Sequence, residues 1–216
     1  MAANLITLIR LVLVFIVVGL FGDNFYVNLA MVALTAIVIW MDALDGYIAR
    51  KLKISSDFGA LFDIVGDRIV ENVYWIFFAV AGVIPFWFPM IVLARGFITD
   101  SLRSAAFAQG KTPFGSKTMM KSKWTQFLVS SRFSRGFYGI SKTVIFIYLG
   151  AFLTLKSAVA QLVLPISPNI VAIFGFVGFF LALLVVVMCL IRGFPVLVDG
   201  WAYICGNPQP EVEQSS

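Results

Sequence analysis

Residues 42–67 read DALDGYIARKLKISSDFGALFDIVGD, a stretch that holds five aspartates, four of them in pairs at helical spacing. Asp42 and Asp45 lie three residues apart, and Asp63 and Asp67 lie four residues apart. Residues at these separations share one face of an α-helix. The stretch therefore predicts two consecutive helices, each with an acidic stripe, and the two stripes can face each other.

The composition places these helices in a membrane. Of the 216 residues, 61% are hydrophobic and 12% are charged, and the mean hydropathy is +0.97, as is typical of helical membrane proteins. The length leaves room for about six spans of roughly 20 residues. We expect an all-α membrane protein with six transmembrane helices in one bundle. The predicted spans are 5–21, 26–49, 58–80, 85–108, 141–164 and 170–191.

Charge in the connections predicts the orientation. Lys and Arg gather after the second and fourth spans, at Arg50, Lys51, Lys53, Lys111, Lys117, Lys121, Lys123, Arg132 and Arg135. The other connections carry Lys156 alone. The positive-inside rule then puts both termini in the cytoplasm. The acidic stripes would lie at the cytoplasmic side of the bundle.

The two ends of the chain and its basic segment, residues 109–140, give further predictions. Arg10 interrupts the first apolar run and no cleavage site follows, so we expect a retained helix rather than a signal peptide. Residues 109–140 interleave lysines with apolar residues, as an amphipathic helix at the membrane surface would. The net charge of +5 fits anionic lipid headgroups, and we expect no nucleic-acid partner. One domain is expected over 1–206, with a disordered polar tail over 207–216.

The aspartates point to metal chemistry. Ionised carboxylates at membrane depth cost several kcal/mol each, and four of them close together would repel one another. Mg²⁺ or Mn²⁺, two ions for four carboxylates, would stabilise the arrangement and clamp a phosphate under attack. The chain has no histidine, which excludes Ser-His and Cys-His nucleophiles. Cys189 and Cys205 are expected to be free thiols.

The same residues fit further kinds of protein. Four intramembrane acids also suit an ion-coupled transporter, or a scaffold that has lost activity. Small residues accompany the aspartates, with Gly46 and Ala49 on the first helix and Gly59 on the second. They leave room for a nucleotide to approach the backbone, but close packing between helices would account for them too.

The pattern as a whole resembles a known family. Asp-x2-Asp-Gly-x2-Ala-Arg-x8-Gly-x3-Asp-x3-Asp, matched at all eight positions from Asp42 to Asp67, is similar to the signature of the CDP-alcohol phosphotransferases. The resemblance implies six transmembrane helices, usually a homodimer, and transfer of a phosphatidyl group from CDP-diacylglycerol with release of CMP. It implies that Asp42, Asp45, Asp63 and Asp67 bind the metal ions and that Asp67 is also the catalytic base. Gly46, Ala49, Arg50 and Gly59 would bind the nucleotide.

The acceptor alcohol follows from a looser resemblance. Residues 4–10 and 94–103 resemble bacterial phosphatidylglycerophosphate synthases, which implies sn-glycerol 3-phosphate as acceptor and a bacterial inner membrane as location. A phosphorylated acceptor needs cations, and Arg95, Arg103 and Lys142 are the candidates. Snorkelling to lipid headgroups would also account for these three cations. Gly96 and the long stretch 116–139 depart from those enzymes, so inositol phosphate or another alcohol remains an alternative.

Overall fold

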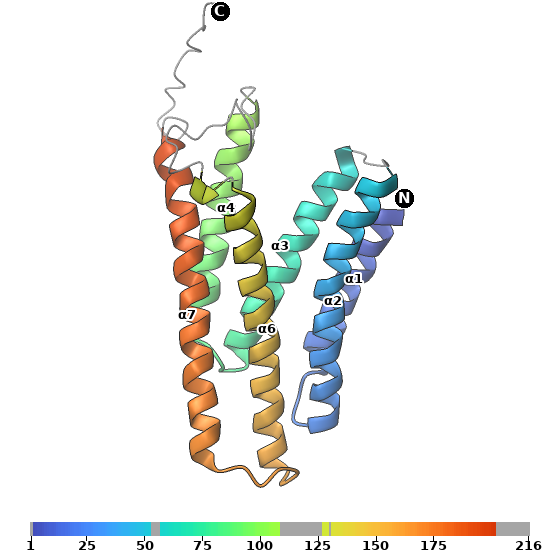
Figure 1. The fold of residues 1–216 in the computed structure, drawn as a ribbon, viewed down its shortest axis with the longest axis vertical. Coiled ribbons are helices and arrows are strands. Elements are labelled where there is room, and N and C mark those ends of the chain that lie inside the picture. Colours follow the sequence, from blue (N-terminus) through green and yellow to red (C-terminus); the bar gives the residue numbers. More distant parts are fainter. Residues whose placement is uncertain (1, 53–56, 109–126, 130, 202–216) are drawn as a thin grey trace, which may run out of the picture. The chain divides into compact units, whose positions relative to one another are not determined.

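The computed structural model describes the backbone of residues 2–52, 57–108, 127–129 and 131–201, and the side chains of these ranges except 2–3, 42–52, 57–58, 60 and 132. Long helices make up most of it (Figure 1), and the described ranges contain no strand. The helices are α1 (Ala2–Leu20), α2 (Phe25–Leu52), α3 (Asp57–Val80), α4 (Trp87–Ala108), α6 (Arg132–Ala160) and α7 (Pro168–Asp199). Each overlaps one predicted span, which confirms the all-α prediction for the described residues. The predicted tail over 207–216 lies outside the described residues.

The helix ends follow local capping chemistry. The Asn24 side chain accepts hydrogen bonds from the backbone N–H groups of Tyr26 (2.9 Å) and Val27 (3.2 Å), and so caps the start of α2. Gly82, two residues after the end of α3, has a φ of 67°, the left-handed conformation that glycine adopts at helix ends. Both residues lie in breaks between the predicted spans.

The start of α6 differs from the prediction. The helix begins at Arg132, nine residues before the predicted span. The Ser131 hydroxyl accepts a hydrogen bond from the Ser134 N–H (3.1 Å), which is an N-cap. Residues 132–140 are therefore the first turns of α6, and the prediction of a separate surface helix is wrong for them. Apolarity alone gave the predicted boundary, whereas the cap decides it. Residues 109–126 of that prediction lie outside the described part of the chain.

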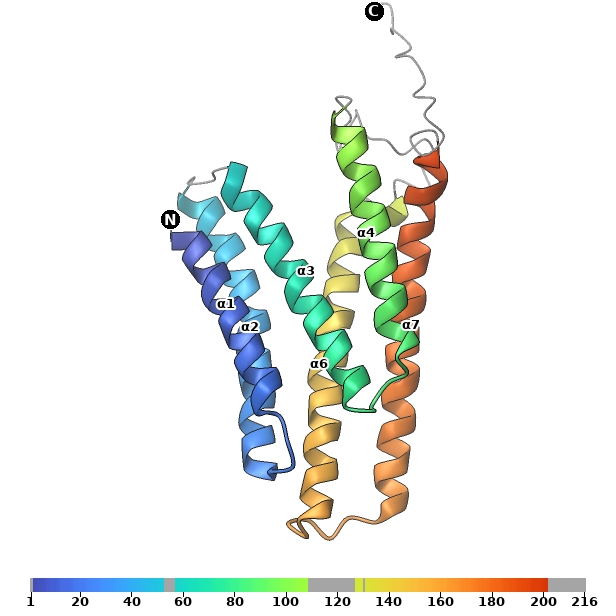
Figure 2. The ribbon, with the colours of Figure 1, turned by 180° about the vertical axis from the view of Figure 1, so that it is seen from behind.

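The chain forms two compact units, and the first contains Met1–Pro89 and Ser141–Leu184. In this unit α1 packs against α2 and α3, which both views of the ribbon show side by side (Figures 1 and 2). Its core is aromatic. The ring of Phe146 on α6 lies 5.2 Å from that of Tyr74 and 5.5 Å from that of Trp75, both buried on α3. Burial of such large rings is a main source of packing energy.

The second unit contains Met90–Ile140 and Val185–Ser216. Its described core is a small apolar cluster formed by Leu102, Ala106, Val129 and Val196. Buried Arg192 on α7 donates hydrogen bonds to the carbonyl of Leu128 (3.2 Å) and to the hydroxyl of Ser134. These bonds tie the last turns of α7 to the segment before α6 and to the first turn of α6.

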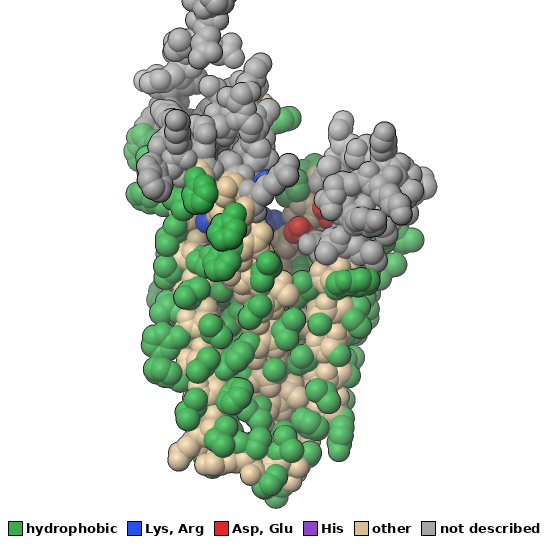
Figure 3. Space-filling view, viewed as in Figure 1, with side chains coloured by type: hydrophobic (Ala, Val, Ile, Leu, Met, Phe, Trp, Pro, Cys, Tyr) green, Lys and Arg blue, Asp and Glu red, His purple; other side chains and the backbone are tan. Residues whose placement is uncertain are grey.

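The helix surfaces are apolar. Large hydrophobic side chains such as Ile173, Phe176 and Phe180 on α7 are exposed, and hydrophobic side chains dominate the described part of the face in Figure 3, with its charged side chains near one end. Among the described residues, two segments are long and apolar enough to cross a membrane, namely Phe127–Ala160, which contains α6, and Pro168–Asp199. Exposed apolar surface of this kind is stable in lipid. The six helices are thus observed, and six separate spans in one bundle stay a prediction.

Candidate active site

Three acids line one face of α3. Asp63, Asp67 and Glu71 follow one another at intervals of four residues, which places them on one face about 6 Å apart along the axis. Asp63 is half-buried and its Oδ1 atom is shielded from solvent. The Asp67 side chain is 47% exposed, and that of Glu71 is 5% exposed. Gly59, also half-buried, lies four residues before Asp63 on the same face. The stripe predicted on this helix is present and is one acid longer.

Arg10 on α1 binds this stripe. Its guanidinium donates a hydrogen bond to Oδ1 of Asp67 and forms an ion pair with it. The Arg10 side chain is 2% exposed, so the positive charge is almost fully removed from solvent. Such a charge needs a partner, and Asp67 supplies it. This pair was not predicted from the sequence. The signal for it was a single arginine inside an apolar run, because intramembrane charges usually mark functional sites.

A close contact between α1 and α3 sets the position of this pair. Gly66 is buried, and a Cβ atom added to it would lie 2.6 Å from Cγ2 of Thr7. Thr7 and Arg10 are one turn apart on α1, and Gly66 directly precedes Asp67. The absence of a side chain at Gly66 therefore lets the helices approach at the level of the Arg10–Asp67 pair. The sequence pattern singled out other glycines but not this one.

Lys142 on α6 joins the acidic face through Glu71. The ammonium group donates a hydrogen bond of 2.8 Å to Oε2 of Glu71, and Arg68 lies 3.6 Å from the same oxygen. Glu71 is nearly inaccessible to solvent, so two cations share the neutralisation of its charge. Glu71 was not predicted from the sequence, although its position continues the four-residue spacing. The candidate acceptor cation Lys142 thus pairs with an acid that lies one helical turn beyond Asp67 on α3.

Five residues of the signature lie on α2, at positions 42, 45, 46, 49 and 50. The backbone is helical there, but the side chains of Asp42, Asp45, Gly46, Ala49 and Arg50 lie outside the described part. That the acidic stripes of α2 and α3 face each other stays a prediction. Among the described side chains, no three metal-binding residues gather. The described donors do suit Mg²⁺ or Mn²⁺, since Asp63 and Asp67 offer carboxylate oxygens one turn apart.

Arg95 and Arg103 lie on α4 in the second unit, whereas Lys142 belongs to the first. The Arg95 guanidinium lies 5.9 Å from the ring centroid of Tyr138. Its Nε atom is buried and has no hydrogen-bond partner in the part of the chain that the structure describes. Arg103 pairs with Asp100 one turn earlier, at 3.7 Å. Arg95 therefore has hydrogen-bonding capacity that a bound anion can use.

Two residues of α7, Arg192 and Gly193, lie near the Arg95 side chain. Arg192 lies 5.5 Å from the centroid of the same Tyr138 ring, so one ring serves two guanidinium groups. A Cβ atom added to Gly193 would lie 2.7 Å from Cγ of Arg95. The Arg95 side chain thus rests in the space that this glycine leaves. Neither residue was predicted from the sequence. Arg192 was detectable as a charge directly after an apolar run, but Gly193 shows only once the helices are packed.

Comparisons with known proteins found one matching family and several relatives. The family profile described as CDP-alcohol phosphatidyltransferase matches residues 1–173, which include the whole signature and Lys142. A candidate phosphatidylglycerophosphate synthase of Mycobacterium tuberculosis is 30% identical over 115 residues, 51% of this chain and 55% of that protein. A CDP-diacylglycerol–glycerol-3-phosphate 3-phosphatidyltransferase of Mycoplasma genitalium is 35% identical over 74 residues, 34% of this chain and 30% of that protein.

Another relative has a different product in its name. A candidate cardiolipin synthase of Mycobacterium tuberculosis is 34% identical over 94 residues, 43% of this chain and 44% of that protein. The chain spans about half the length, or less, of these curated relatives. The profile, by contrast, covers four fifths of the chain and includes every position of the signature. The chain therefore belongs to the CDP-alcohol phosphatidyltransferase family, a family of enzymes.

Proposed function

We propose that this chain transfers the phosphatidyl group of CDP-diacylglycerol to sn-glycerol 3-phosphate and releases CMP. The acceptor hydroxyl oxygen forms a bond to the phosphorus that carries the diacylglycerol. The bond from that phosphorus to the bridging oxygen of the diphosphate breaks, and CMP leaves with the bonding electrons. The proton of the hydroxyl passes to a carboxylate. The products are phosphatidylglycerophosphate and CMP, so atoms and charges balance.

The observation that carries this proposal is the acidic face of α3, on which Asp63 and Asp67 lie one turn apart. We assign metal binding to these two residues together with Asp42 and Asp45 of α2. Divalent ions held there, Mg²⁺ or Mn²⁺ and two in number, would neutralise phosphate charge and stabilise the leaving CMP. Asp67 is also the base that accepts the hydroxyl proton, since half of its side chain stays exposed. Arg10 positions this carboxylate from α1.

The remaining residues bind the two substrates. Gly46, Ala49, Arg50 and Gly59 would hold the CDP part, with Arg50 donating to a phosphate. Arg95, Arg103 and Lys142 would bind the phosphate of the acceptor. The Nε atom of Arg95, which has no hydrogen-bond partner among the described residues, supports this role. We further propose a homodimer in a bacterial inner membrane, with both termini and the site on the cytoplasmic side.

The names of the relatives support the acceptor. Two of them specify phosphatidylglycerophosphate synthesis. The candidate cardiolipin synthase favours a second possibility, in which a lipid alcohol replaces glycerol 3-phosphate. Inositol phosphate would need the same cations and is a third acceptor to test. The signature residues are common to all three possibilities, so only substrate turnover distinguishes them.

Release of CMP by the purified full chain tests the proposal. The assay supplies CDP-diacylglycerol with sn-glycerol 3-phosphate, inositol phosphate, serine or phosphatidylglycerol, with and without EDTA. We expect release with glycerol 3-phosphate, its loss in EDTA, and its recovery when Mg²⁺ or Mn²⁺ is added back. Release with phosphatidylglycerol or inositol phosphate alone would identify a different acceptor but support the same transfer reaction. A folded protein that binds metal yet releases no CMP with any alcohol would favour a transporter or an inactive scaffold.

A further inference from the structure

Few charged residues lie away from the helix ends that carry the acidic stripe of α3. Residues 11–41 contain Asp23 as their single charged residue, residues 72–94 contain none, and residues 143–191 contain Lys156 alone. Lys156 is also the exception to the distribution of basic residues that predicts the orientation. A lysine on the translocated side opposes the positive-inside rule. Membrane orientation therefore does not account for Lys156, nor for Asp23.

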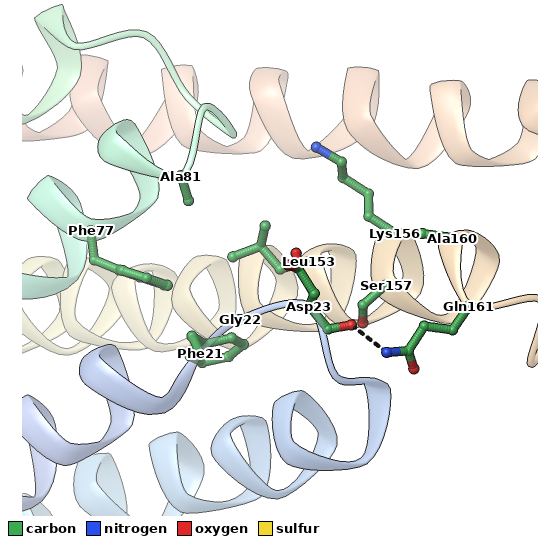
Figure 4. Close-up of a pocket in the computed structure, with 10 residues that line it drawn as sticks. All are labelled: Phe21, Gly22, Asp23, Phe77, Ala81, Leu153, Lys156, Ser157, Ala160 and Gln161. Carbon is green, nitrogen blue, oxygen red and sulfur yellow. Dashed lines mark hydrogen bonds between the residues drawn. The ribbon is translucent and has the colours of Figure 1, made fainter.

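Both charges line one cavity, which has a volume of about 530 Å³ and lies wholly in the first unit. Figure 4 shows it framed by the turn after α1, the end of α3 and the last turns of α6. The rings of Phe21 and Phe77 and the side chain of Leu153 form its apolar part. Its volume is within the range of ligand sites, about 300 to 1,000 Å³.

The cavity is distant from the acidic stripe. α1 and α3 run in the same direction, because Arg10 meets Asp67 and, further along both helices, Phe21 meets Phe77 with ring centroids 5.3 Å apart. The second contact lies ten residues beyond the first on α3, which is about 15 Å along the axis. A ligand in this cavity would therefore bind away from the carboxylates to which we assign catalysis.

Hydrogen bonds connect the polar part of the cavity to neighbouring elements. The Gln161 side chain donates a hydrogen bond to the backbone carbonyl of Asp23 (2.9 Å) and accepts one from the N–H of Phe25 (3.2 Å). Asn28, buried on α2, donates to the Gly22 carbonyl (2.7 Å) and to the Ser157 hydroxyl (3.1 Å). The turn that carries Asp23 is thus fixed to the end of α6, which carries Lys156.

The two charged groups themselves can bind a ligand. No ion pair joins Asp23 to Lys156, and no described residue forms a hydrogen bond with either charged group. The ammonium of Lys156 lies 6.0 Å from the ring centroid of Phe152. Two opposite charges, held apart in one half-apolar cavity, match a ligand that carries both a phosphate and an ammonium group.

We propose that this cavity binds a phospholipid whose headgroup carries a primary ammonium, as phosphatidylethanolamine does. Lys156 pairs with the lipid phosphate, and Asp23 accepts hydrogen bonds from the ammonium. Phe21, Phe77 and Leu153 contact the upper part of an acyl chain. The position at the helix ends, next to apolar surface, favours a membrane lipid over a soluble phosphate ester. The lipid belongs to the leaflet opposite the acidic stripe.

Lipid titration of the purified, delipidated full chain, followed by native mass spectrometry, tests the site. The probes are dioleoyl phosphatidylethanolamine, the matching phosphatidylcholine and phosphatidylglycerol, and soluble phosphoethanolamine. We expect phosphatidylethanolamine to bind at least tenfold more tightly than the other three. Choline lacks the N–H donors for Asp23, glycerol lacks the positive charge, and phosphoethanolamine lacks the acyl chains. Equal or tighter binding of phosphatidylglycerol would overturn the proposal.

Two single variants locate the binding. Asp23→Asn and Lys156→Gln should each weaken phosphatidylethanolamine binding about tenfold. Lys51→Gln is the control, because residue 51 lies at the opposite end of α2 from the turn that carries Asp23, and it should leave binding unchanged. Unfolding temperatures of all variants exclude misfolding as the cause. Wild-type binding in both pocket variants would refute the site. CMP release is measured on the same preparations. Because the lipid titration needs no turnover, a failure of CMP release and a failure of lipid binding can be told apart.

Discussion

Arg10 and Asp67 form an ion pair that joins α1 to the acidic face of α3. The arginine is buried, whereas about half of the aspartate side chain faces solvent. The guanidinium can therefore hold the carboxylate in one orientation while an exposed part of it remains for a substrate or a metal ion. In this family member, the first helix thus contributes a side chain that contacts the candidate site. The pair gives rise to the first three predictions.

Asp67→Asn should reduce CMP release by at least about 100-fold, the lower range for loss of a general base. The amide cannot accept the proton, but its oxygen can still accept the hydrogen bond from Arg10, so the fold should persist. CMP release and the unfolding temperature in detergent measure the two effects. Asp57→Asn, on the same helix but at a position that the signature leaves unspecified, is the matched control and should retain activity. Normal release by Asp67→Asn would exclude the assigned base.

Arg10→Met should lower CMP release by roughly 10- to 100-fold, as loss of a residue that orients a metal ligand does. It should also lower the free energy of unfolding by about 1.5 kcal/mol, the lower value for a hydrogen bond to a charged group, because Asp67 is partly solvated. Arg10→Lys keeps the charge but not the planar donors, and should recover part of the activity. Titration of activity with Mg²⁺ checks the cause: the half-saturating concentration should rise in Arg10→Met. An unchanged half-saturating concentration would mean that Arg10 acts only on stability.

Gly66→Ala should destabilise the protein by about 1 to 3 kcal/mol, the usual cost of overpacking. The new Cβ would meet Cγ2 of Thr7 at 2.6 Å, and α1 would have to move away from α3. Thr7→Ser removes that methyl group, so the double variant should recover most of the lost stability. The unfolding temperatures of the four proteins form a double-mutant cycle. Additive effects in the cycle would show that the two residues do not meet.

Lys142→Met should destabilise the protein, because the nearly buried Glu71 carboxylate loses its 2.8 Å ion pair with Lys142, and Arg68 lies further away at 3.6 Å. We expect a loss of about 2 kcal/mol, less than for a fully buried pair since Lys142 is partly exposed. Adding Glu71→Gln removes the buried charge and should restore the unfolding temperature. If Lys142 also binds the acceptor phosphate, the double variant should keep a KM for glycerol 3-phosphate raised roughly tenfold. A restored KM would assign Lys142 a structural role alone.

Gly193→Ala should displace the Arg95 side chain, because the added Cβ would lie 2.7 Å from its Cγ and 2.9 Å from its Nε. If Arg95 binds the acceptor phosphate, the KM for glycerol 3-phosphate should rise roughly tenfold, within the energy of one charge-assisted hydrogen bond. The KM for CDP-diacylglycerol should not change. Gly136→Ala is the control, since a Cβ added there meets no described atom within 4 Å. Equal changes in both variants would exclude the positioning of Arg95 by Gly193.

The sequence predicts the helices well for a physical reason. Apolar runs mark the spans, and the cap at the start of α2 (Asn24) and the glycine after α3 (Gly82) lie in the breaks between predicted spans. The predicted boundary of α6 was wrong because its first turns carry polar residues, so apolarity could not detect them. The cap at Ser131 depends on a local hydrogen bond that many serines could form, and the pattern alone did not single it out.

The sequence by itself determined the residue types of the candidate site and their spacing, because carboxylates four residues apart on a helix share a face whatever surrounds them. It also determined the family, since the signature is a local pattern. Only the tertiary structure decided the partners. Arg10 is 57 residues from Asp67 and Lys142 is 71 from Glu71, and Asp23 and Lys156 line one cavity only because the turn after α1 lies against the end of α6. Such pairs depend on helix register and on small residues such as Gly66, which no local spacing encodes.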